Sequence, residues 1–479
     1  MFQTITSELP KDTDYPERQF RLDVFRRVLK GELYDHLKHG FYEEKNGAGE
    51  YIPLRQRRPC VKYNISKIVV DDSVSLLFSE GHFPDIESDD EDVKTALAAL
   101  VKESKLNELM VDAATRGSVG SVAIFFQVLK NRVFFTVMDT PFLTPEWDPE
   151  APDTLSKVTE RYKVKGNALA DCGYTISDNS ATYWFTREWT AEFETYYQPQ
   201  SLDDASAGKS LIIDETRTVQ HKLGFVPIVW VKNLPGGEGV DGACTFKEAI
   251  DTQIEIDYQL SQAGRGLKYS SDPTLLIKEP TQNDGTMVKG AANAIVVSQD
   301  GDAKLLEIDG TAATAVVEFV KALREFALET IHGNRSNAEK ISVAQSGRAM
   351  EMMNQALIML ADRLRISYAE GALLNLLTMV IRASHKFQLV ISDKKIQALN
   401  KSASISLRWP AWYPPTSQDQ LTTAQALKEH TEAGHMSHET ATRVIAADYD
   451  IEDVDGERKK IEKQKKEPKE KSGQVPEQK

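Results

Sequence analysis

The layout of the helices between residues 246 and 386 constrains this chain most. Apolar residues recur at helical spacing from Phe246 to Tyr269 and again from Thr311 to His332. The segment between them holds short β-like runs and two turn sequences, Asn283-Asp284-Gly285 and Asp300-Gly301-Asp302. A polar stretch, 334–345, then leads into a very long helix expected from Ser346 to about Lys386. Two helices separated by an inserted strand pair, then a loop and a long helix, are not the layout of a common enzyme core.

Composition indicates a soluble cytosolic protein. The 479 residues suffice for two to four domains, and 41% hydrophobic with 27% charged residues is ordinary. The cysteines Cys60, Cys172 and Cys244 are widely spaced, which argues against a disulfide framework or a thiolate metal site. We expect no signal peptide. We also expect no membrane span, because the most apolar window, 371–381, is far shorter than the roughly 20 residues required.

The net charge of −14 limits the ways in which this protein could interact with nucleic acid. Proteins that grip DNA through its phosphates normally present a basic surface, because counterion release drives their affinity. An acidic chain therefore argues against a high-affinity nucleic-acid binder. It remains compatible with a protein that lets DNA slide past.

The region before residue 246 predicts an α+β body. Helices are expected over 63–80, where Asn64 is a plausible N-cap, and over 93–109, with an acidic solvated loop, 85–92, between them. A hairpin is predicted at Lys130-Asn131. For the basic stretch 55–58, a solvated loop is favoured over a phosphate contact. The expected strands are 122–129, 132–138, 158–164, 181–186, 189–197 and 226–231.

After the long helix the chain is expected to return through short elements. We expect strands at 388–391 and 403–409 with a helix at 393–398 between them, and helices at 417–433 and 437–447, the last capped by Ser437. The tail, 457–479, holds nine Lys or Arg and five Glu with almost no apolar residues. It predicts a solvated helix followed by disorder.

Motifs for catalysis or cofactor binding are missing from the sequence. Gly208-Lys209-Ser210 resembles the end of a phosphate-binding loop, but the glycine required five residues earlier is replaced by Asp203. His435 and His438 have no third ligand nearby and are interpreted as exposed loop residues. We therefore expect no catalytic residue, no cofactor and no metal.

Several local runs nevertheless resemble one family. The run from Asn64 to Phe78 carries Lys67, Val70, Asp71 and Val74 at the spacing seen in portal proteins of long-tailed, siphophage-type phages. Leu223-Gly224-Phe225-Val226-Pro227 resembles a strand lead-in of those proteins. Ser346-Gly347-Arg348-Ala349 resembles the entry to their tunnel helix. The order of the segments, more than any one run, carries the resemblance to tailed-phage portal proteins.

The resemblance implies an α+β portal fold with an α/β wing, a two-helix stem, a small β-containing clip, a long tunnel helix and a helical crown. The implied boundaries are 1–244 for the wing, 245–271 and 311–333 for the stem helices, 272–310 for the clip, 334–345 for the tunnel loop, 346–416 for the tunnel helix and wing return, 417–456 for the crown and 457–479 for the charged tail.

The resemblance also implies a function and its partners. The chain would form a cyclic homo-oligomer, a dodecamer, at one capsid vertex of the virion, after assembly in the host cytoplasm. Double-stranded DNA would pass through it without sequence reading during packaging and ejection. Terminase large subunit, head-completion or adaptor proteins, and the major capsid and scaffolding proteins would dock on it, with no membrane involved.

Charge suggests which residues would serve these roles. The clip holds seven Asp or Glu against three Lys, which would reduce sticking of DNA. An intersubunit salt bridge is an equally good interpretation for Arg348. The implied channel residues are Asn334, Arg335, Ser336, Asn337, Lys340 and Arg348. The implied docking residues are Lys278, Glu279, Asn283, Asp284, Lys289, Asp300 and Asp302.

Two alternatives stay open at this point. Another head–tail connector or minor capsid protein would share a structural role, although adaptors are usually much shorter. A nucleic-acid-processing enzyme is a further alternative, but it would need a set of metal-binding carboxylates that the sequence does not show.

Overall fold

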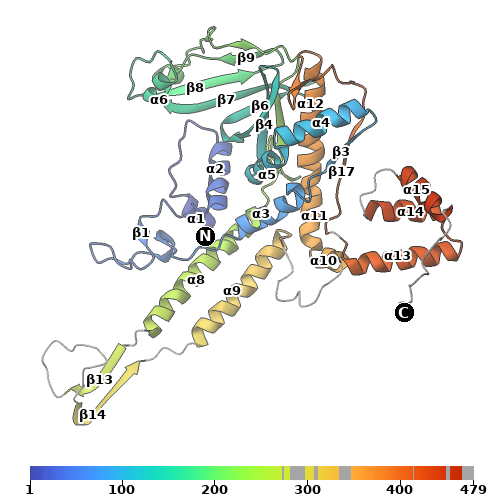
Figure 1. Cartoon of the computed structure of the whole chain (residues 1–479). Coiled ribbons are helices and arrows are strands. Elements are labelled where there is room, and N and C mark those ends of the chain that lie inside the picture. The colour runs from blue at the N-terminus through green and yellow to red at the C-terminus, as the bar shows by residue number, and fades with distance from the viewer. Residues whose placement is uncertain are drawn as a thin grey trace, which may run out of the picture. The chain divides into compact units, whose positions relative to one another are not determined.

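The computed structural model describes residues 1–271, 274–280, 297–306, 311–333, 347–413, 415–448 and 454–466. The chain divides into two compact units, one made of Met1–Asn334 with Ala356–Pro410 and the other of Arg335–Gln355 with Ala411–Lys479. Helices and several small sheets occur together in the first unit, so the fold is mixed α+β, as expected (Figure 1).

A three-stranded antiparallel sheet forms the centre of the first unit. Its order is β12-β4-β5, from Ile228–Lys232, Ser121–Leu129 and Arg132–Asp139. The turn between β4 and β5 places Lys130 and Asn131 at φ values of 49° and 66°. Two consecutive residues with positive φ are typical of the turn that matches strand twist, so the predicted hairpin is confirmed.

A larger antiparallel sheet packs beside it. Its strands follow the order β11-β9-β8-β7-β6, and β10 pairs with β8. The bounds are β6 Leu143–Trp147, β7 Leu155–Lys165, β8 Thr182–Trp189, β9 Phe193–Tyr196, β10 Gln200–Ser201 and β11 Val219–Gln220. The two sheets share one buried cluster: Ala123, Phe125, Leu143, Val158, Trp189, Val226 and Ile228.

Four helices and a long helical run pack around the three-stranded sheet. The helices are α2 Glu17–Lys30, α3 Ile65–Phe78, α4 Glu91–Glu103 and α5 Leu106–Gly117; the run comprises α11 Gln355–Leu364, the π-helical η5 Arg365–Leu373 and α12 Leu374–Ser384. Of these, α5 and η5 contact the strands of the sheet, and α3 and α4 pack on α5. The Asn64 side chain accepts the Lys67 N–H, which confirms the predicted cap. The single helix expected over 93–109 is wrong, because Lys105 adopts φ 47° and separates α4 from α5.

The structure corrects three further expectations. Asp85–Ser88 is strand β3, paired with β17 Ile405–Arg408, where a solvated acidic loop was expected. The helix expected at 393–398 is replaced by the hairpin of β15 Val390–Ile391 and β16 Lys394–Lys395. Arg57 is 2% exposed and donates to the carbonyls of Ile52 and Phe41, so the basic stretch is not a purely solvated loop.

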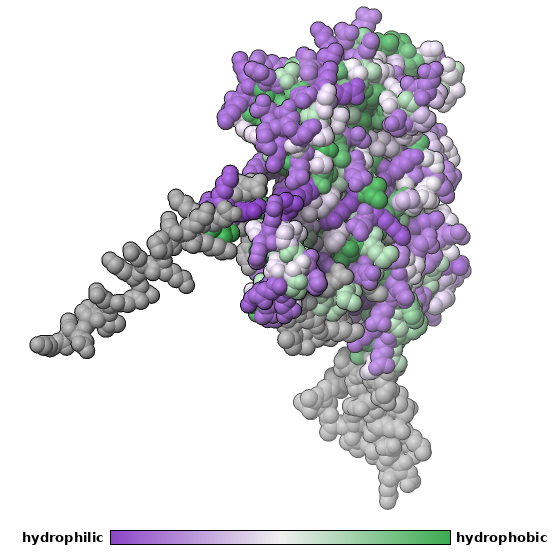
Figure 2. All heavy atoms as spheres, turned by 90° about the vertical axis from the view of Figure 1, so that its right-hand side faces the viewer, coloured by the Kyte–Doolittle hydropathy of each residue, from purple (hydrophilic) through white to green (hydrophobic). Residues whose placement is uncertain are grey.

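Short elements complete the first unit. They are α1 Phe2–Thr6, β1 His39–Gly40, η1 Leu54–Gln56, β2 Arg57–Arg58, η2 Thr140–Phe142, α6 Gly166–Asp171, α7 Leu202–Ser206 and η3 Lys247–Ala249. On the face in Figure 2, hydrophobic side chains form small separate patches among hydrophilic ones.

The second unit is helical where it is described. It contains α10 Gly347–Met353, α13 Ser417–Glu432, α14 His438–Asp448 and α15 Val454–Lys466. Thr416 and Asp419 form a capping box at α13, and Ser437 Oγ accepts the Thr440 N–H at α14, as predicted. The long helix expected from Ser346 is interrupted at Asn354. The disorder expected for the end of the tail lies outside the described residues.

Candidate functional site

The expected helix–insert–helix arrangement is present. Helices α8 Ile250–Ser271 and α9 Thr311–Thr330 pack along each other, and the hairpin of β13 Thr274–Pro280 and β14 Val297–Leu306 follows at their far ends (Figure 1). Register places Lys278 directly opposite Asp302. Glu279 lies in β13 and Asp300 in β14. Asn283, Asp284 and Lys289 lie outside the described residues.

One expectation for this insert is wrong. Asp300-Gly301-Asp302 is not a turn between two strands but lies inside the continuous strand β14. Asp302 pairs with Lys278, but the register then shifts before the next pair, Pro280 with Val297. Asp300 and Gly301 therefore lie in an irregular part of the ladder within β14.

A stripe of polar side chains anchors the start of α8 to the body. Gln253, Asp257 and Ser261 follow one another at four-residue spacing, which places them on one helix face, and all are nearly fully buried. Gln253 Oε1 accepts the Ser66 N–H and Oγ–H at 3.0 and 2.8 Å. Ser261 Oγ accepts the N–H groups of residues 60 and 61, each at 3.1 Å. Sequence reasoning missed this stripe, although three polar residues at i, i+4 and i+8 were a signal.

Asp257 is the charged member of the stripe. Its carboxyl accepts the Tyr34 hydroxyl at 2.8 Å and the Tyr63 N–H at 2.6 Å. Burial raises the pKa of Asp257 to about 7, against the opposing effect of these hydrogen bonds. A buried carboxyl group with a raised pKa thus lies where α8 joins the body.

Helix α9 carries two apolar faces. Val316, Val320 and Leu323 are partly covered, and their spacing is that of a face packed on α8. Phe319 and Phe326 lie on a different face and are 49% and 62% exposed. A two-helix stem would be expected to need a neighbouring subunit to bury Ile250, Ile254 and Val317. This is wrong for Ile250 and Ile254, which are buried by their own chain, whereas Val317 is 44% exposed. Val317 and the two phenylalanines are thus exposed apolar residues of α9.

The end of α9 is docked against α3. A glycine directly after a helix commonly adopts the left-handed conformation, but here His332 does so instead of Gly333, with φ 55°. A side chain at Gly333 would collide with Val69 on α3. Gly333 is therefore required for close approach.

The proposed channel residues fall mostly outside the described part of the chain. Asn334, Arg335, Ser336, Asn337 and Lys340 are in the stretch 334–346, which the structure does not describe. Arg348 is the second residue of α10. The role of these residues in the channel thus stays a prediction.

The helical run that follows is tied into the body by Asn233. Tyr368 on η5 donates to Asn233 Oδ1 at 2.9 Å, and Ser367 Oγ donates to the Asn233 carbonyl at 2.6 Å. A Cβ on Gly117 of α5 would overlap the Tyr368 hydroxyl. The run Gln355–Ser384 is long and apolar enough to cross a membrane by length and composition, which sequence reasoning did not expect. Half of its apolar window is buried within the protein, so we interpret it as a core helix.

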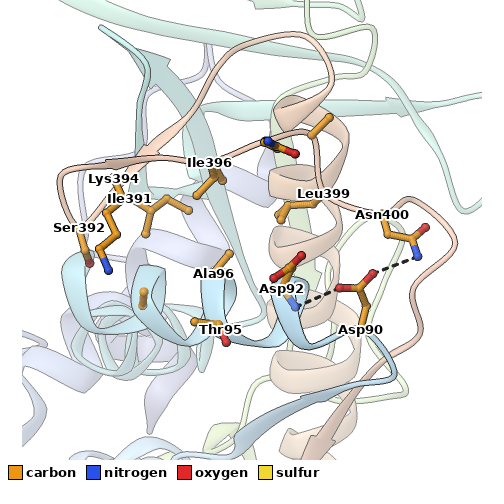
Figure 3. A pocket seen from close by; sticks show the side chains of 13 residues that line it. Asp90, Asp92, Thr95, Ala96, Ile391, Ser392, Lys394, Ile396, Leu399 and Asn400 are labelled. Carbon is orange, nitrogen blue, oxygen red and sulfur yellow. Dashed lines mark hydrogen bonds between the residues drawn. The ribbon is translucent and has the colours of Figure 1, made fainter.

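A pocket of about 630 Å³ lies between α4 and the β15–β16 hairpin (Figure 3). Asp90 accepts the Asp92 N–H at the start of α4 and the Asn400 side-chain amide across the pocket. The Asp90 carboxylate therefore caps α4 with one oxygen and binds a neighbouring loop with the other. The floor is formed by apolar residues such as Ile391, Ile396 and Leu399. This arrangement offers no nucleophile paired with a base.

The other chemical candidates in the sequence are also accounted for. Lys209 follows α7 and forms an ion pair with Asp204 at 2.5 Å, so it is not the lysine of a phosphate-binding loop. His435 and His438 are exposed. Among the described residues, no group of three or more His, Cys, Asp or Glu is arranged to hold a metal ion.

Comparison with known proteins identifies the family. No curated protein matches the chain. The family described as phage portal protein, SPP1 Gp6-like, matches residues 9–471, which is nearly the whole sequence. This family consists of structural rather than enzymatic proteins of the virion capsid, which form an oligomeric ring with DNA. The chain therefore belongs to the phage portal protein family, SPP1 Gp6-like.

Proposed function

We propose that this portal protein forms the ring at one capsid vertex through which double-stranded DNA is packaged and ejected. In this proposal α8 and α9 form the stem, the β13–β14 hairpin is the clip, 334–345 is the tunnel loop and 417–456 is the crown. Terminase and, later, head-completion proteins dock on the clip. The observation that carries the proposal is the family match over residues 9–471.

The exposed face of α9 supports a ring closed by stem contacts. Phe319 and Phe326 are seven residues apart and so lie on one side of the helix. Two large exposed aromatic side chains on one face are typical of a protein–protein contact. In a cyclic ring, the same face of every subunit meets a different face of its neighbour. We assign the facing surface to α8, where Leu267 is 52% exposed.

Imaging of the purified protein tests the proposal. We expect wild-type protein to form rings with a central hole in negative stain, and Phe319→Ser/Phe326→Ser to lower the ring fraction at least tenfold. Phe134→Ser is the matched control, because Phe134 is 40% exposed but lies on β5. A stable wild-type monomer at all salt concentrations would overturn the ring. Rings formed equally well by the double variant would overturn the assigned stem contact.

A further inference from the structure

The six-stranded sheet ends in an edge that no described strand covers. Beyond β11, the same edge continues along residues 211–213, because Tyr197 and Ile213 form an antiparallel bridge. The Gln198 N–H donates to the Ile212 carbonyl, and the Asp214 N–H donates to the Tyr196 carbonyl, both at 2.8 Å. A turn over 214–218 separates the two stretches.

Hydrogen-bond direction shows which backbone groups face outward. In an antiparallel pair, alternate residues direct both N–H and C=O toward the partner strand. Ile212 and Asp214 point toward β9, so Ile213 between them presents its N–H and C=O to the outside. His221 donates to the Glu192 carbonyl, so Gln220 also faces outward. Such groups form a template for another strand.

The side chains along this edge are large and apolar. Ile212, Val219 and Ile213 are 63%, 51% and 50% exposed. Leu211, at the far end of the same stretch, is 37% exposed. β-Branched residues on an unprotected edge promote pairing with other chains. We name residues 211–213 and 219–220 the open edge.

The opposite edge of the same sheet is protected. Strand β6 carries Pro145, which has no N–H to donate. Arg18 donates to the Leu143 carbonyl at 2.9 Å, so that acceptor already has a partner. A neighbouring subunit therefore cannot extend the sheet around the ring by pairing its β6 with the open edge.

Pairing of two open edges is also unsuited to the ring. Like edges pair about a two-fold axis, whereas a cyclic ring repeats unlike contacts from subunit to subunit. We propose that the open edge accepts an extended apolar strand from a different protein of the particle, by β-strand addition. This inference rests on the proposed portal function and adds a partner surface to it.

Hydrogen exchange measured by mass spectrometry tests the inference on isolated rings and on purified particles that contain the protein. We expect the outward-facing amides of Ile213 and Gln220 to exchange at least tenfold more slowly in particles than in rings. Amides of β6 serve as the internal control and should not change. Equal exchange in rings and particles would overturn the proposal. Protection already present in isolated rings, relative to dissociated subunits, would assign the edge to a second copy and also overturn it.

A variant provides the second test. Ile212→Lys/Val219→Lys should form rings as the wild type does, while the fraction of particles containing the protein falls at least tenfold. Leu129→Lys is the matched control, because Leu129 is 53% exposed at a hairpin tip remote from β9 in the sheet order. Normal incorporation of the double variant would overturn the proposal, as would loss of its rings. Failure of the wild type to form rings would instead count against the portal function itself.

Discussion

At the scale of residues, buried polar groups connect α8 to the body. Asp257 is 1% exposed, and burial raises its pKa to about 7. An unfolded Asp titrates near pH 3.9. Between these values the folded protein holds a proton that the unfolded chain has lost, so the free energy of unfolding falls as pH rises from about 4 to about 7.

Asp257→Asn should remove this dependence. At about 1.4 kcal/mol per pKa unit, the effect is on the order of 2–4 kcal/mol. We expect the urea midpoint of the variant, relative to wild type, to rise between pH 4.5 and pH 7.5. Asp251→Asn on the same helix is the control of opposite sign. The Phe2 N–H lowers the pKa of Asp251, so its contribution to stability is present above pH 4 and is lost as pH falls. An unchanged pH dependence in Asp257→Asn would contradict the assignment.

Gly117 illustrates close packing at the same scale. Because its Cβ would overlap the hydroxyl of the buried Tyr368, Gly117→Ala should cost about 1–3 kcal/mol in the free energy of unfolding. Tyr368→Phe removes the nearest atom. The double variant should therefore lose less free energy of unfolding than the sum of the losses in the two single variants. Gly264→Ala on α8 meets no atom within 4 Å and should be neutral or stabilising by up to about 1 kcal/mol. Denaturant titration measures all four, and full additivity would rule out the collision.

At the scale of elements, the β13–β14 hairpin is a short ladder held between two helices. Its strands are paired from Thr274↔Leu306 to Pro280↔Val297, with one irregularity after Lys278. If terminase docks there, reversing the charge at Lys278 or Asp302 should weaken terminase binding at least tenfold and leave ring formation intact. Reversal at Lys428, which is exposed on α13, is the control. Terminase binding of wild-type strength in both hairpin variants would place docking elsewhere.

At the scale of the whole molecule, the proposed channel depends on residues 334–345. Replacing Arg335 and Lys340 by Ala should leave rings and terminase docking intact and alter DNA packaging or retention, because these cations would touch only passing phosphates. Packaged DNA per particle is the measurement. Loss of rings would make the loop a contact between subunits, and unchanged packaging with unchanged retention would show that the two charges do nothing for DNA.

The sequence alone determined the elements whose signals are local. Helical spacing predicted α8 and α9, the Asn64 cap predicted the start of α3, and Lys130-Asn131 predicted the β4–β5 turn, because each signal acts within a few residues. The family resemblance also followed from the order of such segments.

Only the tertiary structure decided what depends on distant partners. β3 forms because β17, more than 300 residues later, pairs with it. Asp300-Gly301-Asp302 lies inside β14 because the strand pairs with β13 on both sides of Gly301, at Val297 and at Asp302. Arg57 is buried because carbonyls of its own loop receive its guanidinium. Gln253, Asp257 and Ser261 read as polar residues of a solvated helix face until residues 60–66 are seen to bind them. The local sequence around a polar side chain or a short strand does not show which groups will form its hydrogen bonds. Those groups come from distant segments and are brought near only by folding.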